Sequence, residues 1–267
     1  MAPVLILTYH AVEPGPEPLC VAPEQFRAHL DCIVDSGVRT VTISELAGAL
    51  GAGMPAEPLV AITFDDGFAS VVDTAALMLA ERGLTATVFC VAGHLGGRND
   101  WPSAHRGGYE SPLADGGALA ELARGGFEIG SHGKLHEPLV HGDEQVLQEE
   151  VVESQLTLQE AVGTPVRSFA YPYGAGPSTE AAHLVAATYG AACTTRIGPV
   201  GRAARVHALP RVDIHYLRRP ELLRRALGGS LDLYLRARGV GARALRLVRK
   251  DYAAAAPYRF GGQSQPE

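Results

Sequence analysis

The chain has 267 residues, of which 46% are hydrophobic and 19% are charged, and its formal net charge at pH 7 is −6. This composition is typical of an α/β protein, and the length suits one barrel or two small domains. No apolar stretch approaches the ~18 residues of a membrane-spanning helix, so we expect no such span. Residues 1–10 lack a basic start and a long apolar region, so we expect a first strand there and no signal peptide. This predicts a cytoplasmic protein.

Strand-like apolar runs alternate with helix-period segments along the whole chain. The expected strands are 4–10, 40–43, 59–64, 84–91, 127–131, 166–171, 191–195 and 208–214. The expected helices are 23–36, 45–50, 68–82, 117–124, 143–162 and 178–189. Ser44 is expected to cap the second helix and Asp143 the fifth. The alternation predicts parallel strands with functional groups at their carboxyl ends.

Two further segments interrupt or follow this pattern. Residues 94–115 form a long loop, whose Trp101 is expected either to stack on a sugar ring or to be buried. Residues 217–250 contain ten basic and two acidic residues, a balance of +8, whereas the rest of the chain carries −14. We expect this basic segment to be a solvated amphipathic helix, or a surface attracted to an anionic membrane or a phosphorylated carrier. The acidic remainder argues against nucleic acid as a partner.

The feature most informative about function is an acidic pair, Asp65 and Asp66, at the end of the apolar run 59–64. Two adjacent carboxylates repel each other, and their burial costs several kcal/mol unless a cation or hydrogen bonds compensate. His132 and His136 follow another expected strand. One carboxylate with two imidazoles is the ligand set of a catalytic zinc or similar divalent ion, with one position open for water. The second carboxylate is then free to act as a general base.

The alternative is that both histidines lie on the surface and bind nothing. The chain contains ten histidines, so a pair four residues apart can arise by chance. The pair also lacks the glutamate that follows the first histidine of a helical zincin motif. Gly130 and Gly133 favour a strand-to-loop turn instead.

Three segments together resemble successive motifs of the polysaccharide deacetylase family (carbohydrate esterase family four, with a NodB-like homology domain). They are TFDDG at 63–67, HGKLH at 132–136 and FAYPYG at 169–174. The segments LTYH at 7–10 and LPR at 209–211 resemble one branch of that family. The resemblance implies an α/β fold, a distorted (β/α) barrel, which we expect over residues 1–216. The charge balance and the composition of the tail predict a basic helical extension over 217–267 with a disordered end.

The resemblance also implies a role for each motif residue. Asp65 is the expected general base, and Asp66, His132 and His136 are the expected ligands of a divalent metal, with zinc the expected ion. The backbone N–H of Tyr173 is expected to stabilise the oxyanion of the tetrahedral intermediate.

Two positions depart from the family pattern. Gly133 stands where a serine or threonine is usual, which removes a hydroxyl behind the first histidine. Ala170 stands where many members carry an arginine that holds the catalytic aspartate. Arg211 is expected either to reach this aspartate from a later strand or to form a surface salt bridge.

The general acid has no clear family counterpart in this chain. His10 ends the first strand and is expected to open onto the same rim as Asp65, so we expect it to act as the acid or to contact substrate. His207 and His215 are expected to be exposed loop histidines.

These features predict a metal-dependent hydrolase that removes an N-acetyl group from an amino sugar, which could be a glycan, a lipid-linked sugar or a small glycoside. One alternative is a related amidohydrolase acting on a non-sugar C–N bond. Another is an inactive relative that only binds carbohydrate. The expected cytoplasmic location favours a biosynthetic intermediate over a finished wall polymer as the substrate.

Overall fold

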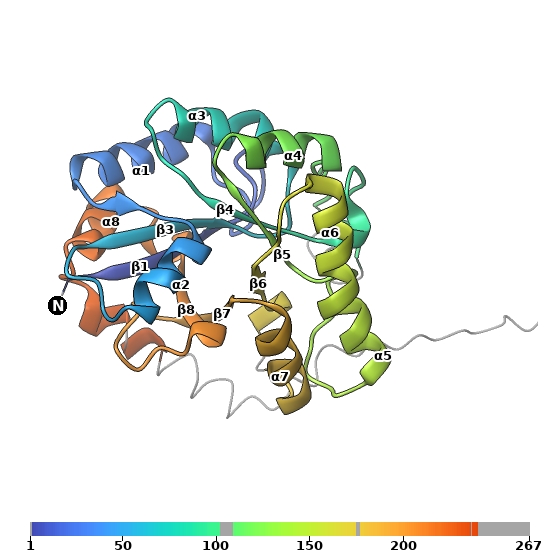
Figure 1. Cartoon of the computed structure of the whole chain (residues 1–267). Helices are drawn as coiled ribbons and strands as arrows, with labels where there is room; N and C mark the ends of the chain where they lie inside the picture. Colours follow the sequence, from blue (N-terminus) through green and yellow to red (C-terminus); the bar gives the residue numbers. More distant parts are fainter. Residues whose placement is uncertain (1, 102–108, 175–176, 236, 240–267) are drawn as a thin grey trace, which may run out of the picture.

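A computed structural model describes residues 2–101, 109–174, 177–235 and 237–239 (Figure 1). Its strands are β1 (Val4–Tyr9), β2 (Arg39–Thr40), β3 (Leu59–Phe64), β4 (Thr87–Cys90), β5 (Glu128–Ser131), β6 (Ser168–Ala170), β7 (Ala191–Ile197) and β8 (Leu209–Asp213). They lie in the order β1-β8-β7-β6-β5-β4-β3-β2, all pairs are parallel, and a further pairing between β1 and β3 closes the barrel. The two-residue β2 pairs only with the start of β3, so the closed barrel consists of the other strands. The predicted distorted (β/α) barrel is confirmed.

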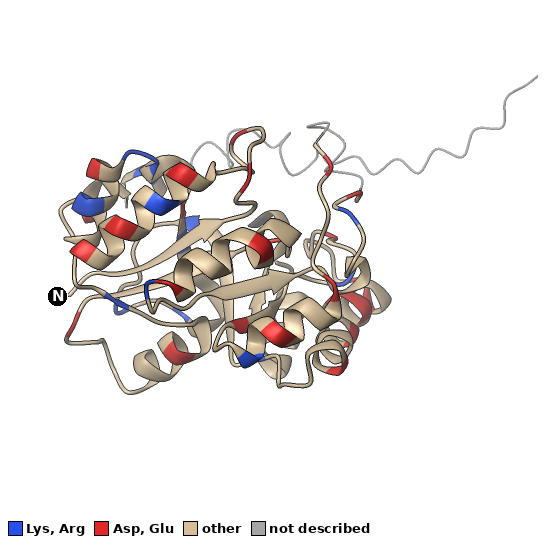
Figure 2. Cartoon of the chain, turned by 90° about the horizontal axis from the view of Figure 1, so that it is seen from above, with Lys and Arg blue, Asp and Glu red and all other residues tan. Residues whose placement is uncertain are grey.

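Helices enclose this barrel (Figure 1). They are α1 (Pro23–Asp35), α2 (Ile43–Gly51), α3 (Ala76–Ala80), α4 (Gly116–Arg124), α5 (Glu144–Leu147), α6 (Ser154–Val162), α7 (Thr179–Thr188) and α8 (Pro220–Leu227). A π-helical segment, Val71–Ala75, precedes α3, and a second, Gln148–Glu153, joins α5 to α6. Figure 2 shows that acidic residues are spread around the outer helices. None of the helices in the described part of the chain is long and apolar enough to cross a membrane.

Alternation along each strand decides which side chains enter the barrel. In β3, Val60, Ile62 and Phe64 belong to the core between strands and helices, whereas Leu59 and Ala61 belong to the core inside the barrel. Both faces are buried, as parallel sheets require when helices surround them. Because side chains alternate with a period of two, the side chain two residues beyond Thr63, that of Asp65, also points inward.

The amino-terminal end of the barrel is closed by α2, whose Ile43 and Leu46 pack in the interior core. The strand predicted at 40–43 is the shorter β2, Arg39–Thr40, and the predicted Ser44 cap was wrong. Thr42 is the N-cap, because its hydroxyl accepts the Glu45 N–H at 3.2 Å while its own N–H donates to the Glu45 carboxylate at 2.8 Å. This reciprocal capping box starts the helix earlier than a Ser44 cap would. The hydroxyl of Ser44 instead donates to Glu128.

The first part of the basic segment belongs to the outer layer of the barrel. The helix α8 packs against α1, and its Leu223 and Leu227 are buried in the same core as the outer faces of the strands. The side chains of Arg219, Arg224 and Arg225 remain exposed. The extension and disordered end predicted beyond residue 239 lie outside the described residues, so the boundary predicted at 216 stays a prediction.

Substitution of a glycine by alanine should have opposite effects on stability inside the barrel and on its surface. In Gly130→Ala, the new Cβ would lie 2.5 Å from the Phe89 ring, so we expect a loss of about 1–3 kcal/mol in the free energy of unfolding. Gly48 is exposed within α2, and nothing lies within 4 Å of the point where a Cβ would stand, so Gly48→Ala should stabilise the protein by roughly 0.5–1 kcal/mol. Urea denaturation of both variants checks this, and equal midpoints would contradict the described packing.

Candidate active site

The side chains singled out from the sequence gather at the carboxyl ends of the strands. Asp65 and Asp66 follow β3, His132 follows β5, and Tyr173 lies in the turn Pro172–Gly174 after β6. Because neighbouring parallel strands end at the same rim, residues far apart in the chain meet there.

Three of these residues form a candidate metal site. One ligand atom each from Asp66, His132 and His136 lies within 4.8 Å of the other two, and all three residues are buried. Nε2 of each histidine lies 3.5 Å from Oδ1 of Asp66. This oxygen is buried without a hydrogen-bond partner in the described structure. A buried, unpartnered carboxylate oxygen facing two ring nitrogens fits a divalent cation, since an isolated buried charge is otherwise costly.

Both imidazoles are oriented through their other nitrogen. Nδ1 of His132 lies 2.7 Å from the carbonyl oxygen of Ala170, and Nδ1 of His136 lies 2.8 Å from the hydroxyl of Tyr173. A carbonyl oxygen can only accept, so Nδ1 of His132 carries the proton. In the neutral imidazole this leaves the lone pair on Nε2, the nitrogen that faces Asp66, as a metal ligand requires. The same arrangement at His136 leaves its Nε2 available when Nδ1 donates to the tyrosine.

Asp65 has a different environment from its neighbour Asp66. The guanidinium of Arg211 binds it through two hydrogen bonds, 2.6 Å to Oδ1 and 2.7 Å to Oδ2. Arg211 is itself 2% exposed and also donates to the carbonyl oxygen of Thr194. Of the two alternatives for Arg211, the contact with the aspartate is therefore present and the surface salt bridge is wrong. The arginine enters from β8, in place of the one missing at Ala170.

Burial and charge move the pKa values of the two aspartates in opposite directions. Burial by itself raises the pKa of Asp65, but the charge and hydrogen bonds of Arg211 together with the charge of His132 outweigh it and hold this pKa well below its usual range. Burial also raises the pKa of Asp66, and there it prevails over the opposing influences of His10 and His132. Asp65 is therefore ionised by the protein alone, whereas Asp66 lacks a protein cation of its own.

Aromatic rings enclose His136. The centroid of the His136 ring lies 4.6 Å from the ring centroid of Trp101 and 4.5 Å from that of Tyr173. Trp101 is buried, which agrees with the second of its two expected roles, while Tyr173 is 39% exposed. Burial and the neighbouring His132 lower the pKa of His136 well below its usual value, so its imidazole is neutral and suited to bind a cation.

The backbone is strained at the site itself. Among the described residues, the non-glycine residues with positive φ are Asp66 (73°), His136 (62°) and Tyr173 (56°). Such conformations persist only when surrounding contacts hold them, and they cluster at functional sites.

A buried glutamate that the sequence did not single out supports the histidine loop. Glu150 accepts the backbone N–H groups of Lys134 (3.1 Å), Leu135 (2.6 Å) and Glu137 (3.2 Å). Burial raises its pKa to about 7 even though these three N–H groups lower it. Gly133, where a hydroxyl-bearing residue was expected, was the signal in the sequence, because a Cβ there would overlap the Glu150 carboxylate.

The remaining histidine candidates differ in position. His10 directly follows β1 and is, after burial, the largest influence on the pKa of Asp66, which it lowers. His207 is half-buried and lies 2.8 Å from the carbonyl oxygen of Tyr189, so its prediction as an exposed histidine was wrong. His215 is exposed, as expected.

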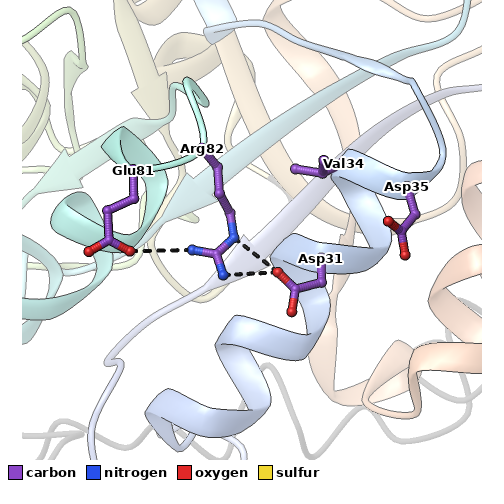
Figure 3. Close-up of a pocket in the computed structure, with 5 residues that line it drawn as sticks. All are labelled: Asp31, Val34, Asp35, Glu81 and Arg82. Carbon is purple, nitrogen blue, oxygen red and sulfur yellow. Dashed lines mark hydrogen bonds and ion pairs between the residues drawn. The ribbon is translucent and has the colours of Figure 1, made fainter.

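A surface hollow between α1 and α3 is not a competing site (Figure 3). It is lined by Asp31, Val34, Asp35, Glu81 and Arg82, and Arg82 forms ion pairs with Asp31 and Glu81. These residues lie at the carboxyl ends of helices that run antiparallel to the strands, so the hollow faces the amino-terminal side of the barrel. It is therefore remote from the rim where the two aspartates and the histidines meet.

The chain belongs to the polysaccharide deacetylase family, whose model matches residues 52–193, more than half of the sequence. The matched range contains Asp65, Asp66, both histidines and Tyr173, whereas His10 and Arg211 lie outside it.

Individual relatives agree with this assignment. YxkH of Bacillus subtilis (strain 168), provisionally assigned as a polysaccharide deacetylase, is 27% identical over 210 residues, which cover 78% of this chain and 70% of YxkH. The deacetylase PplD of Streptococcus pyogenes, solved in complex with acetate, has a TM-score of 0.72 at 24% identity, covering 85% of this chain and 98% of PplD. IcaB of Ammonifex degensii has a TM-score of 0.71 at 24% identity, covering 84% and 98%. These two structures support the same fold.

The geometry predicts one divalent ion per chain, bound by Asp66, His132 and His136. Metal analysis of the purified protein should give a ratio near one, and His136→Ala should lower it sharply, because only two ligands remain. The matched control is His183→Ala, which removes an exposed histidine of α7 and should leave the ratio unchanged. Equal metal content in His136→Ala and the parent protein would show that the ion binds elsewhere.

Proposed function

We propose that this protein is a metal-dependent N-deacetylase that hydrolyses the acetamide group of an N-acetylated amino sugar and releases acetate and a free amine. The observation that carries the proposal is the pair of adjacent buried aspartates in two environments. One is bound by Arg211, and the other faces two histidines. Membership of the polysaccharide deacetylase family and the acetate-bound relative PplD support the reaction class.

In this proposal Asp65 is the general base that takes a proton from the attacking water. The ion pair with Arg211 keeps its carboxylate ionised and fixes its orientation, but it also makes the carboxylate a weak base. A divalent ion held by Asp66, His132 and His136 would supply the Lewis acidity that activates water for such a base and polarises the amide carbonyl. The imidazole donors favour zinc among the common ions.

Two further residues complete the proposed machinery. The backbone N–H of Tyr173 donates to the developing oxyanion, while its side-chain hydroxyl orients His136. His10 donates a proton to the leaving amine. This histidine follows β1, which pairs with β3 along its whole length, so His10 and Asp65 follow neighbouring strand ends. The exposed part of the Tyr173 ring offers a surface against which a sugar can pack.

The reaction is tested by measuring acetate release from N-acetylglucosamine oligomers, small N-acetylated glycosides, lipid-linked N-acetyl sugars and non-sugar acetamides. We expect Asp65→Asn to keep the metal and to lower kcat/KM by about 10²–10⁴-fold, because the general base is lost. The exposed Asp31→Asn serves as the control and should retain full activity.

The outcomes of this experiment separate the alternatives. Activity on the non-sugar acetamides alone would contradict an amino-sugar substrate, and sugar binding without acetate release would indicate an inactive relative. Loss of metal together with activity in Asp65→Asn would mean that the two aspartates have exchanged roles. The variant leaves the buried Arg211 unpaired, which costs about 3–5 kcal/mol, so its folding is verified by circular dichroism.

We also propose that the basic segment 217–250 draws the enzyme to an anionic membrane surface, where a lipid-linked substrate would lie. Attraction of roughly 1 kcal/mol per basic residue near such a surface should fall with added salt. Replacing Arg219, Arg224 and Arg225 by glutamine should therefore weaken co-sedimentation with anionic vesicles. A truncation at 216 is unsuitable because it removes the buried Leu223 and Leu227. Equal, salt-insensitive partitioning of the variant and the parent protein would contradict membrane recruitment.

A further inference from the structure

The loop that carries the two histidines is held on two sides by different kinds of contact. On one side its carbonyl groups accept backbone N–H groups that follow β4: Ala92 donates to Gly133 at 2.9 Å and Gly93 donates to Lys134 at 2.8 Å. These contacts join backbone to backbone and do not depend on any side chain.

On the other side, the N–H groups of the loop converge on a single carboxylate. Oε1 of Glu150 accepts from Leu135, and Oε2 accepts from Lys134 and Glu137. These three N–H groups flank His136, the residue with φ of 62°. A strained residue needs such support on both sides to keep one conformation.

The position of Glu150 within its helix suits this contact. It lies in the π-helical segment Gln148–Glu153 and is 1% exposed. π-Helical segments are rare inside α-helices. Where they occur, they are often at functional sites. The loop is shaped to accept the carboxylate, because a Cβ at Gly133 would overlap Oε2 of Glu150.

We propose that Glu150 is a positioning residue for the metal site: by binding the backbone on both sides of His136, it fixes the position of this imidazole relative to Asp66 and so sets the affinity for the divalent ion. The proposal rests on the metal site of the proposed function and concerns metal binding, before any chemistry on the substrate.

The test compares Glu150→Gln with Glu153→Gln in the full chain, with Zn²⁺ as the probe. Glu153 lies on the same helical segment and binds the same loop, but through the Lys134 ammonium, at 2.6 Å. An amide at position 150 keeps one acceptor oxygen and turns an NH₂ group toward a backbone N–H. We expect Glu150→Gln to weaken Zn²⁺ binding about 10–100-fold, as is typical for residues that hold metal ligands, and Glu153→Gln to leave it unchanged.

Two additional measurements separate positioning from a general loss of stability. At saturating Zn²⁺, kcat of Glu150→Gln should return to within a few-fold of the parent value, because Asp65 and Arg211 are untouched. The Gly133→Ala variant pushes against the carboxylate and also strains a backbone with φ of 85°. It should weaken Zn²⁺ binding on its own and by a smaller factor, the part due to the backbone, in a Glu150→Ala background.

The inference is overturned if Glu150→Gln lowers the melting temperature of the metal-free protein while its Zn²⁺ affinity stays within two-fold of the parent. It is also overturned if Glu153→Gln loses as much affinity as Glu150→Gln. A parent protein that binds Zn²⁺ and shows the expected difference between the variants, yet releases no acetate, would overturn the proposed deacetylase function and leave this inference standing. A parent protein that binds no divalent ion would contradict both.

Discussion

The bidentate ion pair between Arg211 and Asp65 is the interaction on which the site depends. Two adjacent carboxylates at the end of a buried strand cannot both remain ionised without compensation. The protein compensates one of them with a guanidinium and leaves the other facing two imidazoles. This division gives chemically similar neighbours different properties: Asp65 is a fixed, ionised hydrogen-bond acceptor, and Asp66 offers an unpartnered oxygen to a cation. The order of the residues along the strand is not enough to assign these roles, because both face the same rim.

The barrel makes this compensation possible from a distant part of the chain. Arg211 lies 146 residues beyond Asp65 in sequence, yet β8 returns to pair with β1, which itself pairs with β3. An inward-facing residue of β8 therefore reaches the interior near the end of β3. The small Ala170 contributes its carbonyl oxygen to His132 instead of a side chain to Asp65. A β8 side chain can thus compensate a carboxylate at the end of β3, because all strands share one interior.

The sequence predicted those parts of the site that follow from strand ends. Asp66, His132 and His136 were expected together because the family resemblance implies them as one ligand set and each follows an expected strand, and the structure brings them together. Glu150 was not predicted, because it is one of several glutamates in the same helix, and a π-helical segment shifts the helical phase on which a sequence pattern relies. The Ser44 cap failed for a different reason. Thr42 and Ser44 are both good capping residues, and the choice between them depends on the reciprocal bond with Glu45.

Strain and support are arranged so that the reactive groups are fixed before any ligand arrives. The positive φ values at Asp66, His136 and Tyr173 bring their backbone into conformations that cost free energy. The cost is offset by contacts that each orient a functional atom: Tyr173 holds Nδ1 of His136, and Glu150 holds the backbone on both sides of it. The groups that remain exposed, such as Leu135 and part of the Tyr173 ring, lie at the rim above these contacts. Under the proposed function, buried contacts therefore set the geometry of the catalytic groups, and discrimination between substrates falls to the exposed rim.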